Sequence, residues 1–187
     1  DLLSGLEALL PRDQVSPGVR AHNAARCAVE LALIDASLRA TGRGVQDLLP
    51  PTIDEVRYSG VITAGTAESA GARASQFQRI GLDDIKIKVG RDDALDRVRA
   101  VREAVGDGPR LRVDANGAWD LATATATLRS LEPFDVASCE EPLAACDWEG
   151  LARLREAVAV PLMADESLVT ADDARALVES GSIDLFN

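Results

Sequence analysis

The pattern of apolar and polar positions divides the chain into two parts. Residues 20–40 are rich in alanine, and apolar side chains recur there at the spacing of helical turns: Ala24, Ala28, Leu31, Ile34 and Leu38. Two glycines and the proline-containing segment LLPPT at 48–52 follow and break this pattern. We therefore predict a helical first part, residues 1–51, and a separate second part, residues 52–187.

In the second part, short apolar runs alternate with segments of helical spacing. We expect strands at Tyr58–Ile62, Ile85–Val89, Leu111–Val113, Val136–Cys139 and Leu162–Met163, and a sixth beginning at Ile183. We expect helices over residues 66–80, 92–105, 121–131, 148–158 and 171–180. Such alternation predicts an α/β fold with a parallel sheet covered by helices. A doubly wound sheet and a barrel both fit this pattern.

A polar residue stands at the end of each of four apolar runs. These residues are Lys88, Asp114, Glu140 and Asp165, and they are separated by 26, 26 and 25 residues. The loops that follow the carboxyl ends of parallel strands are where α/β enzymes keep their chemistry. The spacing therefore predicts one repeating strand–helix unit with a functional group at the same place in each copy.

Three of these four groups are carboxylates. If the strand ends converge, as they do in a barrel, these carboxylates would repel one another unless a cation binds. Asp114, Glu140 and Asp165 offer oxygen ligands, which suit Mg²⁺, with Mn²⁺ as the alternative. The choice between Glu140 and its neighbour Glu141 stays open, because adjacent side chains in a strand diverge. His22 is the only histidine, so no histidine or cysteine cluster indicates zinc.

The segment DDIKIKVG, residues 83–90, carries two lysines on one face of a predicted strand. Its apolar residues would then face the helices, while Lys86 and Lys88 would face the predicted metal site. A buried lysine beside another cation has a lowered pKa, which makes a usable general base. We interpret Lys88 as this base, and Lys86 as its electrostatic partner and a binder of carboxylate groups.

Each of these features has a simpler explanation when taken alone. Paired lysines can protect an edge strand from further pairing. The residues DAN at 114–116 and DES at 165–167 can form turns or begin helices, and the EEP segment can be a solvated loop. Their joint occurrence at strand ends with nearly constant spacing favours a functional site.

Composition narrows the partners and the compartment. The net charge of −11 disfavours nucleic acid and anionic membrane surfaces, and 47% hydrophobic residues predict an ordered core. No apolar run approaches the roughly 20 residues of a membrane span. The cysteines, Cys27, Cys139 and Cys146, form no CxxC motif, and we expect them in the core. Their odd number fits a reducing, cytoplasmic location.

Four motifs in order resemble the enolase superfamily, and specifically its muconate-lactonizing branch: KIK at 86–88, VDAN at 113–116, EEP at 140–142 and ADES at 164–167. The helical stretch 25–43 is similar to the end of that family's capping domain. The resemblance implies a partial modified TIM barrel, strands one to about six, preceded by the helical part of an α+β capping domain. Residues 1–51 would belong to the cap, and residues 52–187 to the barrel.

The resemblance also implies roles for individual residues. Asp114, Glu140 and Asp165 would bind Mg²⁺, Lys88 would be an acid/base with Lys86 as its partner, and Asn116, Glu141 and Glu166 would support the ligands. The implied reaction removes the proton α to a carboxylate through an enediolate that Mg²⁺ stabilises. The enzyme would be an isomerase or lyase acting on a small carboxylate, and a homo-oligomer stays open.

The sequence departs from the family pattern in one respect. The family's second acid/base lysine lies at the end of the sixth strand, and the period places that position at about residue 191, past Asn187. We therefore expect half a barrel with apolar edges, which is either a fragment of a longer protein or completed by another chain. Dipeptide epimerase, o-succinylbenzoate synthase, N-acylamino acid racemase and muconate cycloisomerase all stay open. The alternative function is a non-catalytic module that keeps the scaffold.

Overall fold

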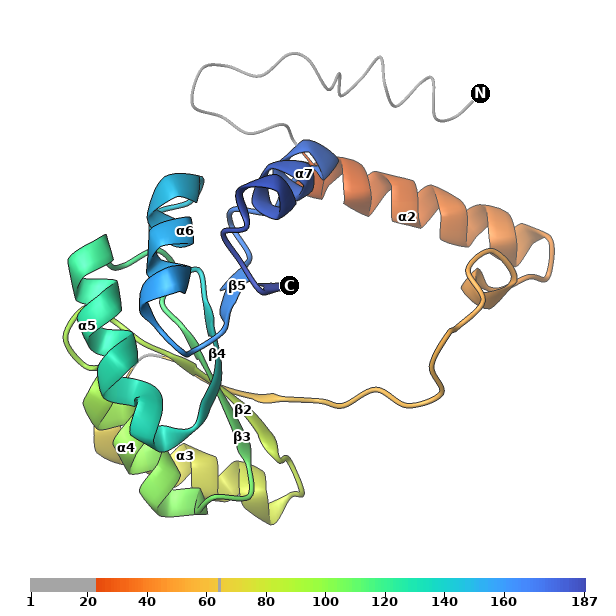
Figure 1. Ribbon diagram of the computed structural model, residues 1–187. Helices are drawn as coiled ribbons and strands as arrows, with labels where there is room; N and C mark the ends of the chain where they lie inside the picture. Colours follow the sequence, from red (N-terminus) through yellow and green to blue (C-terminus); the bar gives the residue numbers. More distant parts are fainter. Residues whose placement is uncertain (1–22, 64) are drawn as a thin grey trace. The chain divides into compact units, whose positions relative to one another are not determined.

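A computed structural model describes residues 23–63 and 65–187 (Figure 1). The chain divides into two compact units between Val56 and Arg57. In the first unit, helix α2 spans Asn23–Ala40 and a 3-10 turn, η1, spans Val45–Asp47. The helix predicted over 20–40 is therefore present from Asn23, and its first three positions, including His22, lie outside the described residues. The assignment of residues 1–51 to a capping domain stays a prediction.

The second unit alternates strands with helices along its whole length, as predicted. The strands are β1 Gly60–Ile62, β2 Asp84–Lys88, β3 Arg110–Asp114, β4 Val136–Glu140, β5 Leu162–Ala164 and β6 Leu185–Phe186. The helices are α3 Ala67–Arg79, α4 Ala94–Val105, α5 Leu121–Leu131, α6 Trp148–Ala157 and α7 Ala171–Ser180, with a 3-10 turn, η2, at Glu132–Phe134.

The strand order decides between the two architectures that the hydrophobic pattern allows. The six strands form one sheet in the order β1-β2-β3-β4-β5-β6, and every neighbouring pair is parallel. A doubly wound sheet reverses its strand order at a switch point, whereas the strands of a barrel follow one another around an arc. The sheet is therefore part of a barrel, and Figure 1 shows α3 to α6 along one of its faces.

The hydrophobic core lies between this face of the sheet and the helices. Ile85 and Ile87 of β2 are fully buried there, and Val89 is nearly so, which confirms the predicted orientation of this strand. Val98 on α4 and Leu128 on α5 pack into the same cluster and are also fully buried. Burying one such side chain stabilises a fold by about 1.5–3 kcal/mol, so this layer holds the sheet in place.

A recurring contact joins successive helices at the amino-terminal edge of the sheet. A long polar side chain near the end of each of four helices donates a hydrogen bond to a backbone carbonyl at the end of the next helical segment. The four bonds run from Gln78 to Val105 (2.9 Å), Arg102 to Phe134 (2.9 Å), Arg129 to Ala157 (3.0 Å) and Arg155 to Gly181 (3.1 Å). Helix ends leave such carbonyls unpaired, and cations are favourable there. The repeat in the sequence is thus also a repeat of capping contacts.

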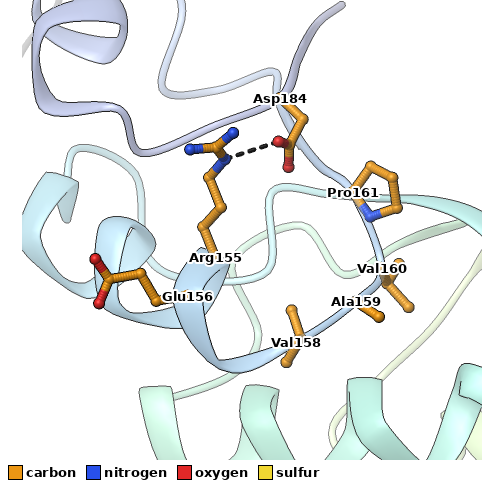
Figure 2. A pocket seen from close by; sticks show the side chains of 7 residues that line it. All are labelled: Arg155, Glu156, Val158, Ala159, Val160, Pro161 and Asp184. Carbon is orange, nitrogen blue, oxygen red and sulfur yellow. Dashed lines mark hydrogen bonds and ion pairs between the residues drawn. The ribbon is translucent and has the colours of Figure 1, made fainter.

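Arg155, which makes the last of these contacts, also lines a pocket. Figure 2 shows Arg155 pointing to Asp184, and their Nε and Oδ1 atoms lie 2.7 Å apart. The second oxygen of Asp184 accepts a hydrogen bond from the backbone N–H of Leu162 at 2.9 Å. This ion pair therefore connects α6 to the beginnings of both β5 and β6.

Several predicted boundaries and one class of residue need correction. β1 begins at Gly60 because Tyr58 is 77% exposed and lies outside the sheet pairing, and β6 begins at Leu185, two residues after the predicted start. Only Cys139 is buried, while Cys27 and Cys146 are exposed, so the core assignment was wrong for two of the cysteines. Within the described part of the chain, no helix is both long and apolar enough to cross a membrane.

Candidate active site

Two lysines and two carboxylates meet on the sheet face opposite the helices. Lys86 Nζ lies 2.6 Å from Glu140 Oε1 and 2.9 Å from Asp114 Oδ2, and Lys88 Nζ lies 3.0 Å from the same Asp114 oxygen. The sheet register pairs Lys88 with Asp114 and Asp114 with Glu140, so three consecutive strand ends place these side chains in one row. The predicted convergence of Lys86, Lys88, Asp114 and Glu140 is therefore observed.

Burial and charge act against each other in this cluster. Burial favours neutral Lys86, but its hydrogen bonds to Glu140 and Asp114 outweigh this and raise its pKa. Burial alone would raise the pKa of Asp114, yet hydrogen bonds from Lys86 and Lys88 lower it below the usual value. The pKa of Glu140 is raised, first by burial and then by the negative charges of Asp114 and Asp165, against the opposing bond from Lys86.

The surroundings of Lys86 raise its pKa rather than lower it. Its closest partners are carboxylates, and they stabilise the charged ammonium. Its side chain is 16% exposed, compared with 40% for Lys88. Of the two, Lys88 is thus the more accessible amine and Lys86 the more firmly held cation.

Asn116 links Lys88 to the loop after β5. Its Oδ1 accepts a hydrogen bond from Lys88 Nζ at 2.6 Å, and its Nδ2 donates to Glu166 Oε1 at 2.9 Å. The backbone has a positive φ of 45°, and its N–H donates to Asp114 Oδ1 at 3.0 Å. Asparagine adopts this left-handed conformation more readily than most residues, which explains its place directly after the strand.

The structure separates the two adjacent glutamates that the sequence left open. Glu140 faces the lysines, whereas Glu141 has a φ of 38° and turns its side chain toward the loop after β5. Its carboxylate accepts hydrogen bonds from the N–H groups of Asp165 (2.9 Å) and Ser167 (3.0 Å), and from the Ser167 hydroxyl. Glu140 is therefore the one of the pair that lies at the candidate metal site.

The donor set has the chemistry that a hard cation requires. Asp114 and Glu140 are 1% and 2% exposed, and the Lys86 ammonium lies within contact of both. Asp165 adds a third negative charge, which contributes to the raised pKa of Glu140. Among residues 23–63 and 65–187, however, no three histidine, cysteine, aspartate or glutamate side chains are already arranged as a metal site. The oxygen donors fit Mg²⁺, and in this arrangement Lys86 supplies the compensating charge.

Two residues to which the sequence assigned no role in the site connect its loops. The indole N–H of Trp119 donates to Gly90 O at 3.1 Å, and its backbone N–H donates to Pro142 O at 3.3 Å. Ser167 is fully buried, bonds to Glu141, and accepts a hydrogen bond from the N–H of Cys146 at 3.0 Å. A single tryptophan in a loop carries no signal of such a role, although Ser167 does lie within the ADES motif.

Known proteins are similar to this chain in both sequence and structure. The family described as enolase C-terminal domain-like matches residues 69–187. The o-succinylbenzoate synthase of Thermobifida fusca is 40% identical over 129 residues, covering 66% of this chain and 39% of that protein.

Solved structures agree with these sequence matches. A dipeptide epimerase from Cytophaga hutchinsonii, complexed with Mg and the dipeptide D-Ala-L-Val, has a TM-score of 0.78 and 33% identity, covering 83% of this chain and 43% of that one. The L-Ala-D/L-Glu epimerase from Bacillus subtilis has a TM-score of 0.85 and 30% identity, covering 99% and 52%. The chain spans about half the length of these relatives, and the likeness confirms the predicted partial barrel.

Proposed function

Because the chain belongs to the enolase superfamily, in its muconate-lactonizing branch, we propose that the natural protein containing it is a Mg²⁺-dependent enzyme that removes the proton α to a carboxylate. The observation that carries this proposal is the contact of Lys86 and Lys88 with Asp114 and Glu140 at adjacent strand ends. A capping or edge-protecting role for the same residues explains neither their mutual contacts nor the burial of the carboxylates.

Asp114, Glu140 and Asp165 would hold the metal ion. Each stands at the end of a successive parallel strand, and the first two are almost completely buried. When bound, Mg²⁺ would neutralise the second negative charge that develops on the substrate carboxylate as the proton leaves. The three carboxylates would hold the ion at the mouth of the barrel.

Lys88 is the group that takes and returns the proton. Its side chain is 40% exposed, and its amine is directed by Asp114 on one side and Asn116 on the other. Nζ in its neutral form accepts the α-proton, and the resulting ammonium is stabilised by the same two partners. Lys86, held by two carboxylates, keeps its positive charge beside the reacting centre and attracts the anionic substrate.

Proteins similar to this chain include dipeptide epimerases, a chloromuconate cycloisomerase and an o-succinylbenzoate synthase. Proton transfer next to a carboxylate is the step that these outcomes share in our proposal. Epimerisation needs a second acid/base on the opposite face of the substrate, and none of the residues described at this site takes that position. We therefore propose the shared half-reaction at Lys88 for this chain, with a small carboxylate, such as a dipeptide, as the substrate class.

The test is exchange of the substrate α-proton with solvent deuterium. The natural protein is incubated with Mg²⁺ and a panel of dipeptides and N-acyl amino acids in D₂O, and the α-proton signal is followed by NMR. We expect exchange with at least one compound, and a loss of about 10²–10⁴-fold in Lys88→Ala. Arg99→Ala is the control, since Arg99 is an exposed cation paired with Asp96 on α4.

The outcomes separate the two functions that the sequence allows. Exchange that depends on Mg²⁺ and on Lys88 supports the enzyme. Exchange that continues in Lys88→Ala contradicts the role of this lysine. Binding of carboxylates without exchange by any compound, in protein saturated with Mg²⁺, would instead support the non-catalytic module.

A further inference from the structure

We propose that Ser167 and Glu141 form a buried latch that positions Asp165 for metal binding. The latch is defined by these two side chains, which lie on different loops at the carboxyl-terminal edge of the sheet. The inference rests on the proposed function, because it assigns Asp165 a metal to hold. It goes further by naming the contacts that fix where this carboxylate stands, and by giving Ser167 a role.

One carboxylate gathers three donors from a single loop. Glu141 Oε2 accepts the N–H of Asp165 at 2.9 Å and the N–H of Ser167 at 3.0 Å. Its Oε1 accepts the hydroxyl hydrogen of Ser167. Glu141 is 2% exposed and Ser167 is fully buried, so water does not replace these bonds easily. The backbone on both sides of Glu166 is therefore bound to the end of β4.

The backbone of Glu141 is held in the conformation that the latch needs. Its φ of 38° is uncommon for a residue with a side chain, and such residues persist where the surroundings impose them. The N–H of Glu141 donates to Met163 O at 2.9 Å, and its carbonyl accepts the N–H of Gly117 at 2.7 Å. Bonds from both neighbouring strand ends thus turn Glu141 away from Glu140 and toward Ser167.

The Ser167 hydroxyl also contacts the far end of the loop after β4. It donates to Glu141 and accepts the backbone N–H of Cys146 at 3.0 Å, where Cys146 itself has a φ of 69°. A hydroxyl has one hydrogen to donate, and here it is used, while the oxygen accepts at the same time. The Ser167 oxygen therefore contacts the loop after β4 at two points, Glu141 and Cys146.

This arrangement matters for a metal ligand because Mg²⁺ demands near-ideal octahedral geometry at short distances. Asp165 directly follows β5, which is only three residues long, so the strand ladder alone constrains it weakly. Its backbone N–H and that of Ser167, two residues on, both bond to Glu141. Loosening the latch would therefore displace the Asp165 carboxylate without removing it.

The experiment removes the hydroxyl alone. Mg²⁺ binding to the natural protein and to Ser167→Ala is measured by titration calorimetry, and amide hydrogen exchange is measured on the metal-free proteins. We expect Mg²⁺ affinity to fall about 10- to 100-fold, as for other residues that orient ligands, and the amides of Asp165 and Ser167 to exchange faster. Ser167→Thr, which keeps a hydroxyl, should recover part of both.

Ser182→Ala is the matched control. Ser182 is also fully buried and hydrogen-bonded, and it lies just after the opposite end of α7, where it contacts Ser180. This variant tests whether any lost serine hydrogen bond near α7 weakens metal binding through stability alone. We expect it to lower the melting temperature while leaving Mg²⁺ affinity unchanged.

Glu141→Gln provides a second route to the same answer. The amide keeps one acceptor for the two backbone N–H groups but replaces the acceptor of the Ser167 hydroxyl with a donor. We expect a loss of affinity, and a double variant with Ser167→Ala whose loss is smaller than the sum of the two single losses, because the pair acts as one unit.

The two proposals fail in different ways. Wild-type protein that binds no Mg²⁺ contradicts the proposed function. Wild-type protein that binds Mg²⁺, with unchanged affinity and unchanged amide exchange in both Ser167→Ala and Glu141→Gln, overturns the latch.

Discussion

The two edges of the sheet use charged side chains in different ways. At the carboxyl-terminal edge, Asp114 and Glu140 are buried against lysine ammonium groups. At the amino-terminal edge, Arg102 and Arg155 reach backbone carbonyls at the ends of the following helices. At the carboxyl-terminal edge the charged groups contact one another, whereas at the amino-terminal edge arginines also satisfy backbone carbonyls that helix ends leave unpaired, alongside ion pairs such as Arg155 with Asp184.

The backbone shows the same contrast. In the described chain, three of the four non-glycine residues with positive φ, Asn116, Glu141 and Cys146, lie in loops at the carboxyl-terminal edge. At the amino-terminal edge, left-handed positions after helices are taken mainly by glycines, such as Gly106 and Gly181, with Asp135 as the exception. Strain of about 1–3 kcal/mol per residue is thus held where we place the chemistry, and largely avoided where the contacts serve stability.

The largest expected effect comes from Asp165→Asn at the carboxyl-terminal edge. The change removes a negative charge from the proposed ligand set with little change in volume. We expect Mg²⁺ affinity to fall by more than about 100-fold, beyond the loss for a residue that only orients a ligand. Calorimetric titration checks this, with the melting temperature of the metal-free protein as the control. Retained affinity would remove Asp165 from the metal site.

Leu128→Ala tests the core that supports both edges. Leu128 on α5 is fully buried in the cluster between the helices and the sheet. Its truncation should lower the free energy of unfolding by about 2–5 kcal/mol, through lost burial and the remaining cavity. Urea denaturation measures this loss. A loss well below that range would mean that the helix layer relaxes around the missing side chain.

Arg102→Ala tests the amino-terminal edge directly. Its guanidinium donates to the carbonyls of Phe134, Pro109 and Gly106 at 2.9 Å each. Losing these bonds should cost about 1.5–3 kcal/mol of unfolding free energy and leave the kcat of the folded enzyme unchanged. Arg99→Ala, an exposed neighbour on the same helix, should stay within about 0.5 kcal/mol of wild type. A changed kcat in Arg102→Ala would break the division of roles between the edges.

The smallest expected effect is that of Trp119→Phe. The smaller phenyl ring still occupies part of the buried position, but the hydrogen bond from the indole N–H to Gly90 O is lost. We expect a destabilisation of about 1 kcal/mol. Because Gly90 follows Lys88 by two residues, a rise in KM without a fall in kcat would show that Trp119 also positions the loop after β2 for substrate binding. An unchanged KM would confine its role to packing.

The alternation of strands and helices was predictable because both kinds of element have strong hydrophobic periods. The strand ends were also predictable, since Lys88, Asp114, Glu140 and Asp165 recur at nearly equal spacing. Boundaries were less predictable, as at Gly60, where the strand begins only where a partner strand provides hydrogen bonds. The prediction that Cys27 and Cys146 lie in the core was wrong, because a small cysteine side chain is tolerated on an exposed helix face or loop as well as in the interior.

By itself, the sequence determined the repeating strand–helix unit and which residue types stand at the end of each strand, because these depend on local periodicity. Only the tertiary structure decided the arc-like strand order, the separation of Glu140 from Glu141, and the joining of Ser167 to the loop after β4. These features depend on hydrogen bonds between segments that lie 20 or more residues apart. No pattern within one segment records such bonds.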